Sequence, residues 1–191
     1  MTPKRQFIIF LTFVVGFVLL LAVVFGRGPG ARNSDKKNNT KKVFSLNDYA
    51  QRDSEVVAVI DGPINGNDAH RSIRITVSRG SRTIDVMQGY EGKVIKTQTF
   101  VNNPDAYYDF IHALARTGFG KTVKSSYENE IGICATGRRY TYEVLDNNDS
   151  VSRTWGASCV KGNSAAASDV VNNLFRMQIT GFGKIIEDVD Y

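Results

Sequence analysis

A long apolar segment near the start of the chain is the strongest hydropathy signal in the sequence. Residues 7–25 read FIIFLTFVVGFVLLLAVVF, nineteen positions without a charged side chain. A helix over this stretch covers roughly 28 Å at about 1.5 Å per residue, close to the ~30 Å hydrocarbon core of a bilayer. The apolar region of a cleaved secretory signal usually runs only about 7 to 15 residues. The pattern predicts a short tail over residues 1–6 and a single uncleaved transmembrane anchor over residues 7–26.

Beyond residue 43 the apolar positions alternate with polar ones, which is typical of half-buried β-strands. The predicted strands cover residues 56–60, 73–77, 84–88 and 94–101. Turns are expected at Gly80-Ser81 and Glu91-Gly92. Because the connections are short, the four strands are expected to pair as an antiparallel meander.

A helix is predicted after Asn103, where several start signals coincide. Asn103 can cap the helix, Pro104 suits its first position, and Asp105 lies where the helix dipole favours an anion. One apolar face then follows at i, i+3, i+4 and i+7, formed by Tyr107, Phe110, Ile111 and Leu114. Gly118 is expected to end the helix in a left-handed conformation.

The rest of the chain repeats the change from strands to helix. Strands are predicted over residues 138–145 and 151–157, around a turn at residues 146–149. The next helix is expected to start at Ser164 or Ser168, to carry Val170, Leu174 and Met177, and to stop before Gly181. The final apolar run, residues 184–189, is expected to pair as a closing strand.

The two halves also share a pentapeptide, TGFGK, at residues 117–121 and 180–184. Each copy follows a predicted helix and precedes a β-branched stretch. We interpret this as an internal duplication of a β-hairpin–helix–strand unit, with chance recurrence of helix-ending glycines as the alternative. The sequence therefore predicts one α+β domain over residues 44–191, with an antiparallel sheet and two helices.

The net charge of +5 is divided unevenly along the chain. Residues 1–43 hold eight Lys and Arg against one acid, whereas residues 44–191 hold sixteen against eighteen acids. A folded part with a charge of −2 argues against a nucleic-acid-binding domain. The basic excess belongs to residues 27–43, which are too polar to form a core and are expected to be a flexible stalk. The stalk is expected to be a solvated tether, or to touch anionic lipid or wall polymer.

The flanks of the anchor do not settle which side of the membrane carries the domain. Lys4 and Arg5 precede the anchor, and six cations follow it in residues 27–42, so the positive-inside rule alone would keep the domain in the cytoplasm. Long domains often translocate despite such charges, however, and a disulfide would require an oxidising compartment. We therefore expect a single-pass cell-membrane protein whose C-terminal domain lies outside the cytoplasm.

Cys134 and Cys159 are the only cysteines, and they flank the second predicted hairpin. If Asn147 and Asn148 form the centre of its turn, the cysteines lie nearly opposite each other, with the offset absorbed by a bulge at Gly137 or Gly156. We expect a disulfide, worth about 3 to 4 kcal/mol in the chain-entropy treatment. The alternative is a pair of buried free thiols.

No motif in the sequence predicts a catalytic, cofactor or metal site. Gly120-Lys121-Thr122 resembles the end of a P-loop, but a P-loop precedes its helix, and here the predicted helix comes first. Cys134 with His112 has no local signature of a catalytic pair. His70 and His112 have no spacing that would complete a zinc site with the cysteines. We expect no cofactor.

The predicted function class follows mainly from this lack of catalytic, cofactor and metal-binding motifs. A non-catalytic binding or interaction module with an unknown protein partner is expected, with a structural or assembly subunit of a surface complex, or an enzyme with an unrecognised site, as alternatives. Strand alternation gives Arg153 and Trp155 a common face, and Arg139 faces the same way as Glu143. Trp and Arg dominate binding energy at many interfaces, so Arg139, Arg153 and Trp155 are the candidate contact residues. Replacing both arginines by alanine is expected to weaken partner capture without lowering stability.

Overall fold

The computed structural model describes residues 43–191. The predicted tail and anchor, and the predicted stalk up to residue 42, lie outside the described residues. Within the described range, no helix is both long enough and apolar enough to cross a membrane.

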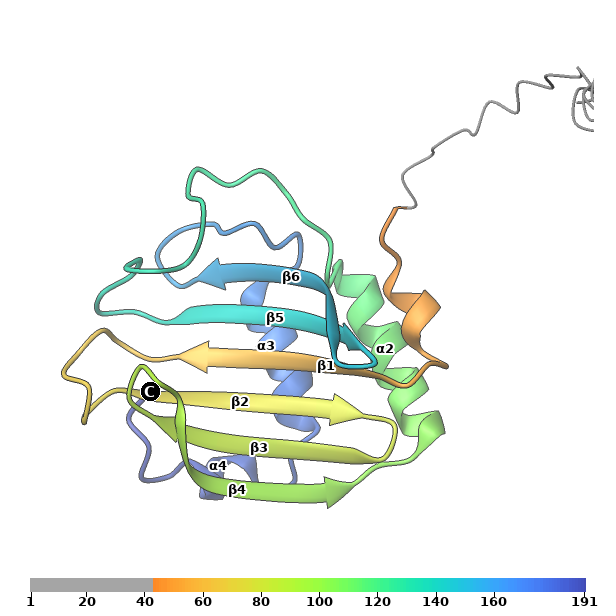
Figure 1. Ribbon diagram of the computed structural model, residues 1–191, viewed down its shortest axis with the longest axis horizontal. Helices are drawn as coiled ribbons and strands as arrows, with labels where there is room; N and C mark the ends of the chain where they lie inside the picture. The colour runs from red at the N-terminus through yellow and green to blue at the C-terminus, as the bar shows by residue number, and fades with distance from the viewer. Residues whose placement is uncertain (1–42) are drawn as a thin grey trace, which may run out of the picture. The chain divides into compact units, whose positions relative to one another are not determined.

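Residues 43–191 form an α+β domain, as predicted, with six strands, three α-helices and one 3-10 helix. In chain order the elements are η1 (Leu46–Tyr49), β1 (Ser54–Asp61), β2 (Arg71–Ser78), β3 (Ser81–Gln88), β4 (Lys93–Val101), α2 (Pro104–Thr117), β5 (Arg139–Asp146), β6 (Asp149–Ala157), α3 (Ser168–Met177) and α4 (Phe182–Ile185). The strands make one antiparallel sheet in the order β4-β3-β2-β1-β5-β6 (Figure 1). The meander and the second hairpin are thus confirmed, and β1 joins them at the centre of the sheet.

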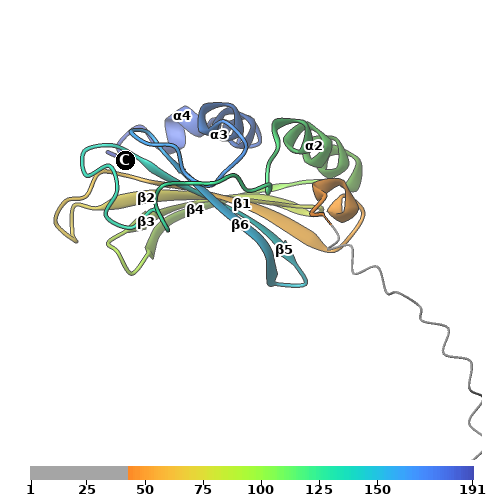
Figure 2. The same cartoon turned by 90° about the horizontal axis from the view of Figure 1, so that it is seen from above.

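All helices lie on one face of the sheet (Figure 2). The strand residues that point toward the helices are almost completely buried, and on β1 and β2 they are Val56, Ala58, Ile60, Ile73, Ile75 and Val77. By strand alternation the residues between them point to the opposite face. The helices of residues 43–191 leave that face uncovered (Figure 2). Burial of one such aliphatic side chain stabilises a fold by about 1.5 to 3 kcal/mol, so period-two alternation fixes which face of each strand meets the helices.

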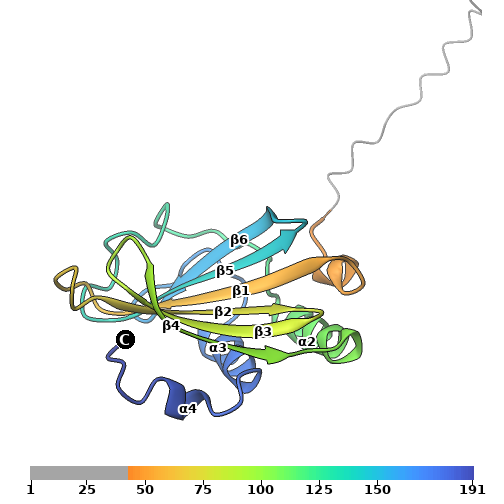
Figure 3. The ribbon, with the colours of Figure 1, turned by 60° about the horizontal axis from the view of Figure 1, so that its bottom comes forward.

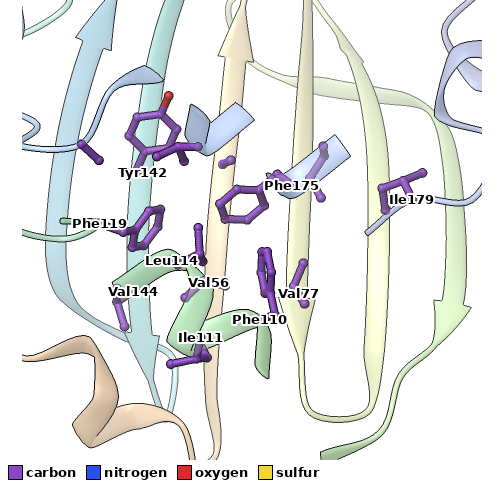
Figure 4. Packing of buried hydrophobic residues seen from close by; sticks show 14 of the residues in the cluster. Val56, Val77, Phe110, Ile111, Leu114, Phe119, Tyr142, Val144, Phe175 and Ile179 are labelled. Atoms are coloured by element: carbon purple, nitrogen blue, oxygen red, sulfur yellow. The ribbon is translucent and has the colours of Figure 1, made fainter. Parts of the chain in front are cut away.

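Aromatic rings connect the helices to the sheet (Figure 4). Phe110 of α2 meets Phe175 of α3 edge-on, with ring centroids 5.3 Å apart. Phe119, just after α2, contacts both Phe175 and Tyr142 of β5 at centroid distances of 5.8 and 5.7 Å. The Tyr142 hydroxyl donates a hydrogen bond to Asn172 Oδ1 at 3.1 Å, so the buried phenol is not left without a partner.

Helix α2 confirms the signals from which it was predicted. The Asn103 side chain accepts a hydrogen bond from the Ala106 N–H at 2.9 Å, and Pro104 is the first helical residue. Gly118 ends the helix in a left-handed conformation with φ of 87°. The four predicted apolar residues of its face are all buried.

The last part of the chain differs from the prediction in two respects. Helix α3 starts at Ser168, but Val171 and Phe175 are its buried apolar residues, whereas Val170 and Met177 are exposed. The predicted closing strand at residues 184–189 is wrong, because residues 182–185 form α4 and the remainder is turn and coil. A short apolar run fits either kind of element, and here Ile185 reaches the core from a helical turn.

The second hairpin contains the predicted turn and disulfide. Asn147 and Asn148 both have positive φ, as a tight two-residue turn requires. Cys134 and Cys159 are bonded, with a Cα–Cα distance of 5.8 Å. The bulge is not at Gly137 or Gly156 as expected, but where the register shifts next to Val144, at the turn end of the hairpin.

The two ends of the sheet carry different connections (Figures 1 and 3). At one end lie η1, Val43 and the turns β2–β3 and β5–β6; we call this the Val43 end. At the other lie the β1–β2 loop (residues 62–70), the β3–β4 loop (residues 89–92) and the segment leading into β5 (residues 125–138); we call these three loops the loop end.

Candidate interaction site at the loop end

Hydrogen bonds join the three loops of the loop end. The Ile64 N–H donates to the Ala135 carbonyl at 2.7 Å, which ties the β1–β2 loop to the segment before β5. The Tyr90 hydroxyl donates to the Asn65 carbonyl at 2.9 Å and accepts from the Asn65 N–H at 3.1 Å. The three loops therefore form one hydrogen-bonded structure, although the sequence separates them by up to about 70 residues.

A buried arginine lies beneath these loops. Arg139 is only 3 % exposed, and its Nε and Nη2 donate to Asp61 Oδ2 at 2.8 and 2.6 Å. The same guanidinium donates to the Gly62 carbonyl and to the Ile133 carbonyl, the latter at 3.2 Å. Arg139 thus neutralises Asp61 and holds the backbone of two loops, a task that suits the fixed fork of donors on a guanidinium.

His70 completes this network from the other side of Asp61. Its Nε2 lies 2.7 Å from Asp61 Oδ1, and its Nδ1 lies 3.1 Å from the Pro63 carbonyl oxygen. The ring is 2 % exposed and stacks on Tyr90 with a centroid distance of 4.1 Å and an interplanar angle of 13°. Both ring nitrogens thus lie within hydrogen-bond distance of an oxygen, one on each side of the ring.

The disulfide adds a covalent link to the same end. It joins Cys134, in the segment before β5, to Cys159, just after β6. Around it, the Arg138 N–H donates to Ser158 Oγ and the Ser158 N–H donates to the Arg138 carbonyl, each at 2.9 Å. The segment that leads into β5 is therefore held at its end by a cross-link, two hydrogen bonds and the Arg139 contacts.

Large apolar side chains are exposed on the three hydrogen-bonded loops of the loop end. Ile131 is 80 % exposed and Tyr90 is 55 % exposed, and Ile64 and Tyr127 are also exposed. Single exposed apolar residues need no explanation, but each of the three loops here carries at least one. Exposed apolar groups on loops that a scaffold holds in place are typical of binding surfaces.

The three contact residues predicted from the second hairpin lie in different environments. Arg139 and Trp155 are buried, the tryptophan with 1 % exposure, whereas the Arg153 side chain is 45 % exposed. They do share one face of the sheet, because Thr141 pairs with Trp155 and Glu143 with Arg153. Direct contact with a partner stays a prediction for all three, but only Arg153 is open to one without a rearrangement. Replacing Arg139 is now expected to lower stability, contrary to the expectation from the sequence, because this side chain is buried and bonds to Asp61 and to loop backbone.

Arg153 is also engaged within the domain. It forms an ion pair with Glu130 and another with Glu143, the latter at 3.2 Å. Burial alone would raise the pKa of the Glu130 carboxyl, but hydrogen bonds from Arg153 and the nearby backbone outweigh it and lower that pKa. The hydrogen bond that Arg153 donates to the Glu130 carboxylate likewise raises the pKa of Arg153. Glu130 thereby fixes the middle of the segment before β5 against β6.

The chemistry near this end gives little support to catalysis. Cys134 is in a disulfide, so it is not a free nucleophile. A cavity of about 490 Å³ beside β6 and the start of α3 is lined by Tyr140, Trp155 and part of the stretch 156–169, and the residues in that lining with a formal charge at neutral pH are Lys161 and Asp169. Among residues 43–191 no group of three His, Cys, Asp or Glu side chains is arranged to hold a metal ion.

Sequence reasoning missed the residues that build the loop end. In the sequence His70 stands out only as a possible zinc ligand, and Asp61 and Tyr90 carry no signal of their own. Asp61 and Arg139 are 78 residues apart and meet only because β1 pairs with β5. The one usable signal is Arg139, which lies on a predicted strand. Arginine is rarely buried, and a buried arginine implies a carboxylate partner.

Comparison with known proteins adds no family. No protein-family model matches the chain. No curated protein matches its sequence. The geometry of residues 43–191 therefore carries the functional argument.

Proposed function

We propose that this protein is a membrane-anchored, extracytoplasmic interaction module that binds a protein partner through its loop end. One observation carries the proposal: three loops, tied together around the ion pair between buried Arg139 and partly exposed Asp61, expose large apolar side chains. Ordering a loop on binding costs free energy, and loops already held by hydrogen bonds and a disulfide avoid most of that cost. The exposed groups are Ile131, Tyr90, Ile64 and Tyr127.

The location rests on two features of the sequence and one of the fold. Residues 7–26 have the length and polarity of a bilayer-spanning helix, and residues 27–43 have the composition of a solvated stalk. The Cys134–Cys159 disulfide supports an oxidising compartment. The protein should remain with membranes after a high-salt wash, and protease added to intact cells should remove the domain; a protected domain would place it in the cytoplasm.

The proposed ancestry of the domain is a duplication of a hairpin–helix unit. Hairpin β3–β4 is followed by α2, hairpin β5–β6 is followed by α3, and both helices cover the same face of the sheet. In the two TGFGK copies Gly118 and Gly181 both have left-handed φ, at 87° and 71°. The strand expected after each helix is not part of the repeat, because α4 occupies that place in the second copy.

Site-specific photo-crosslinking in intact cells tests the binding surface. A photoreactive amino acid at position 131 should give a partner adduct, because Ile131 is 80 % exposed at the loop end. The matched control is position 101, because Val101 is 85 % exposed at the end of β4, at the Val43 end of the sheet. Equal adducts from both positions, or none from position 131, would overturn the proposal.

An assembly subunit is the second candidate function, and strand β4 favours it. This nine-residue outer strand has exposed side chains along almost its whole length, and its outer edge pairs with no other strand of residues 43–191. However, the strand also has features that discourage edge-to-edge pairing, namely Lys93, Lys96 and the register shift next to Met87. Sedimentation of the full chain in micelles over a hundredfold concentration range should therefore give one monomeric species; a concentration-dependent oligomer would favour assembly.

A further inference from the structure

The charge of the loop end narrows the class of partner. Its three loops contain four acidic residues, Asp68, Glu91, Glu128 and Glu130, and a single Lys or Arg, Arg138. The domain as a whole is close to balanced, with sixteen basic and eighteen acidic residues from position 44 onward. The acidic excess is thus concentrated on the loops that also expose the apolar side chains.

Three of these carboxylates are free to meet a partner. Asp68, Glu91 and Glu128 are exposed, and none of them has an ion pair with any residue of the range 43–191. Glu130 differs from them, because its carboxylate already forms an ion pair with Arg153. An exposed carboxylate is fully solvated in the free protein, so pairing it with a partner's cation needs little desolvation at the rim of an interface.

Two of the arginines at these loops already bond to groups of the domain itself. Arg71 donates to the Asp68 carbonyl at 2.6 Å and to the His70 carbonyl at 2.9 Å. Arg138 donates to the Tyr191 carbonyl oxygen at 2.9 Å and stacks on the Tyr191 ring. Lys93 and Lys124 border the loops and remain exposed, so they set the limits of the acidic surface.

We infer that the partner is a polypeptide segment that carries Lys or Arg next to apolar side chains. Its apolar groups contact Ile131 and Tyr90, and its cations contact Asp68, Glu91 and Glu128. Opposite charges at the rim of an apolar contact speed association and fix its orientation. Nucleic acids and anionic lipids are repelled by the same surface, so a polypeptide is the occupant whose chemistry fits. This inference rests on the proposed function, because it assigns a partner class to the same loops.

The test uses the crosslink at position 131 and asks what lies at the other end of it. Mass spectrometry of the adduct should identify a peptide segment with a net positive charge. Its yield on isolated membranes should fall as ionic strength rises, because exposed ion pairs are screened by salt. A neutral or acidic segment, a lipid or a carbohydrate in the adduct would overturn the inference.

Two triple variants of the full chain complete the test. Asp68→Asn with Glu91→Gln and Glu128→Gln should lower the adduct yield about tenfold, since three exposed pairs at up to ~0.5 kcal/mol each sum to about that factor. The control, Asp109→Asn with Asp149→Asn and Glu187→Gln, removes the same charge from exposed acids elsewhere and should change the yield less than twofold. Equal yields from both variants would overturn the partner class while leaving an interaction at the loop end intact; absence of any adduct from the parent chain would overturn the proposed function itself.

Discussion

The two ends of the sheet are stabilised by different physical means. At the loop end, Asp61, His70, Arg139 and a disulfide hold the chain through directional bonds. At the Val43 end, Phe44 lies over Gly120 and stacks on Tyr49 at a centroid distance of 5.7 Å, and Ser54 bonds to Tyr107 at 2.9 Å. Apolar packing tolerates sequence change gradually, whereas a buried ion pair fails when either partner is lost. Single substitutions should therefore lower stability more at the loop end than at the Val43 end.

Removal of the disulfide should have the largest effect and should affect the two ends unequally. Cys134→Ser with Cys159→Ser frees a loop of 26 residues, which costs about 3.5 kcal/mol of unfolding free energy in the chain-entropy treatment. Hydrogen exchange should accelerate at the Ile64 amide, which donates to Ala135, well before it does at Ala50 of the Val43 end. The measurement is chemical unfolding plus exchange of the full chain in micelles; uniform acceleration at both ends would contradict the comparison.

Arg139→Ala should come next, with a loss of about 3 kcal/mol. It leaves Asp61 without its guanidinium partner and takes the donor from the Gly62 and Ile133 carbonyls, and removing the buried member of an ion pair is costly. Arg138→Ala is the matched control, because the neighbouring arginine is exposed and should cost less than about 1 kcal/mol. Similar unfolding midpoints for the two variants would show that the Asp61 network does not stabilise the loop end.

The Val43 end has its own sensitive position at Gly120. Its φ is 77°, and a Cβ there would collide with the Phe44 ring, so Gly120→Ala should cost about 2 kcal/mol. Gly183→Ala is the control, since nothing lies within 4 Å of a Cβ at that position. Thermal melts followed by near-ultraviolet circular dichroism should separate the two. A harmless Gly120→Ala would mean that Phe44 is not fixed to the domain.

The smallest effect should be a pH dependence that involves Glu130. The folded state lowers the pKa of this carboxyl from its ordinary value of 4.5, so Glu130 stabilises the fold above about pH 4.5, and that contribution disappears as pH falls through the lowered value. Glu130→Gln should therefore reduce the unfolding midpoint at pH 7 and have a smaller effect at pH 3. An equal reduction at both pH values would show that charge on Glu130 is not the cause.

The sequence predicted those parts of the fold whose signals are local. The cap at Asn103, the left-handed Gly118 and the strand alternation around Ile75 each depend on a few neighbouring residues, and all are confirmed. The disulfide was predictable for a similar reason, because one hairpin brings both cysteines together. The segment 184–189 was ambiguous, since a short apolar run fits a strand or a helical turn, and only packing of Ile185 decides.

The candidate site depended on contacts that a local pattern does not contain. Asp61 and Arg139 look like ordinary charged residues at a strand end and a strand start, and the pairing of β1 with β5 is what makes them partners. His70 is held in place by stacking on Tyr90 and by a hydrogen bond to the Pro63 carbonyl, and neither contact is visible in the sequence. Exposure of Ile131 and Tyr90 likewise follows from tertiary structure, because nothing in the sequence separates an exposed isoleucine or tyrosine from a buried one.

The central place of β1 has a consequence for how the chain acquires its structure. Each other strand pair is made by consecutive strands, whereas β1 pairs with β5 across 78 to 92 residues. Closing so long a loop is slow, so this pairing is expected to be the late step of folding. Until it occurs, one edge of the apolar stretch VVAVI in β1 is open to strands of other chains. A newly made molecule is therefore most exposed to aggregation after residue 101 has emerged and before residue 146 has.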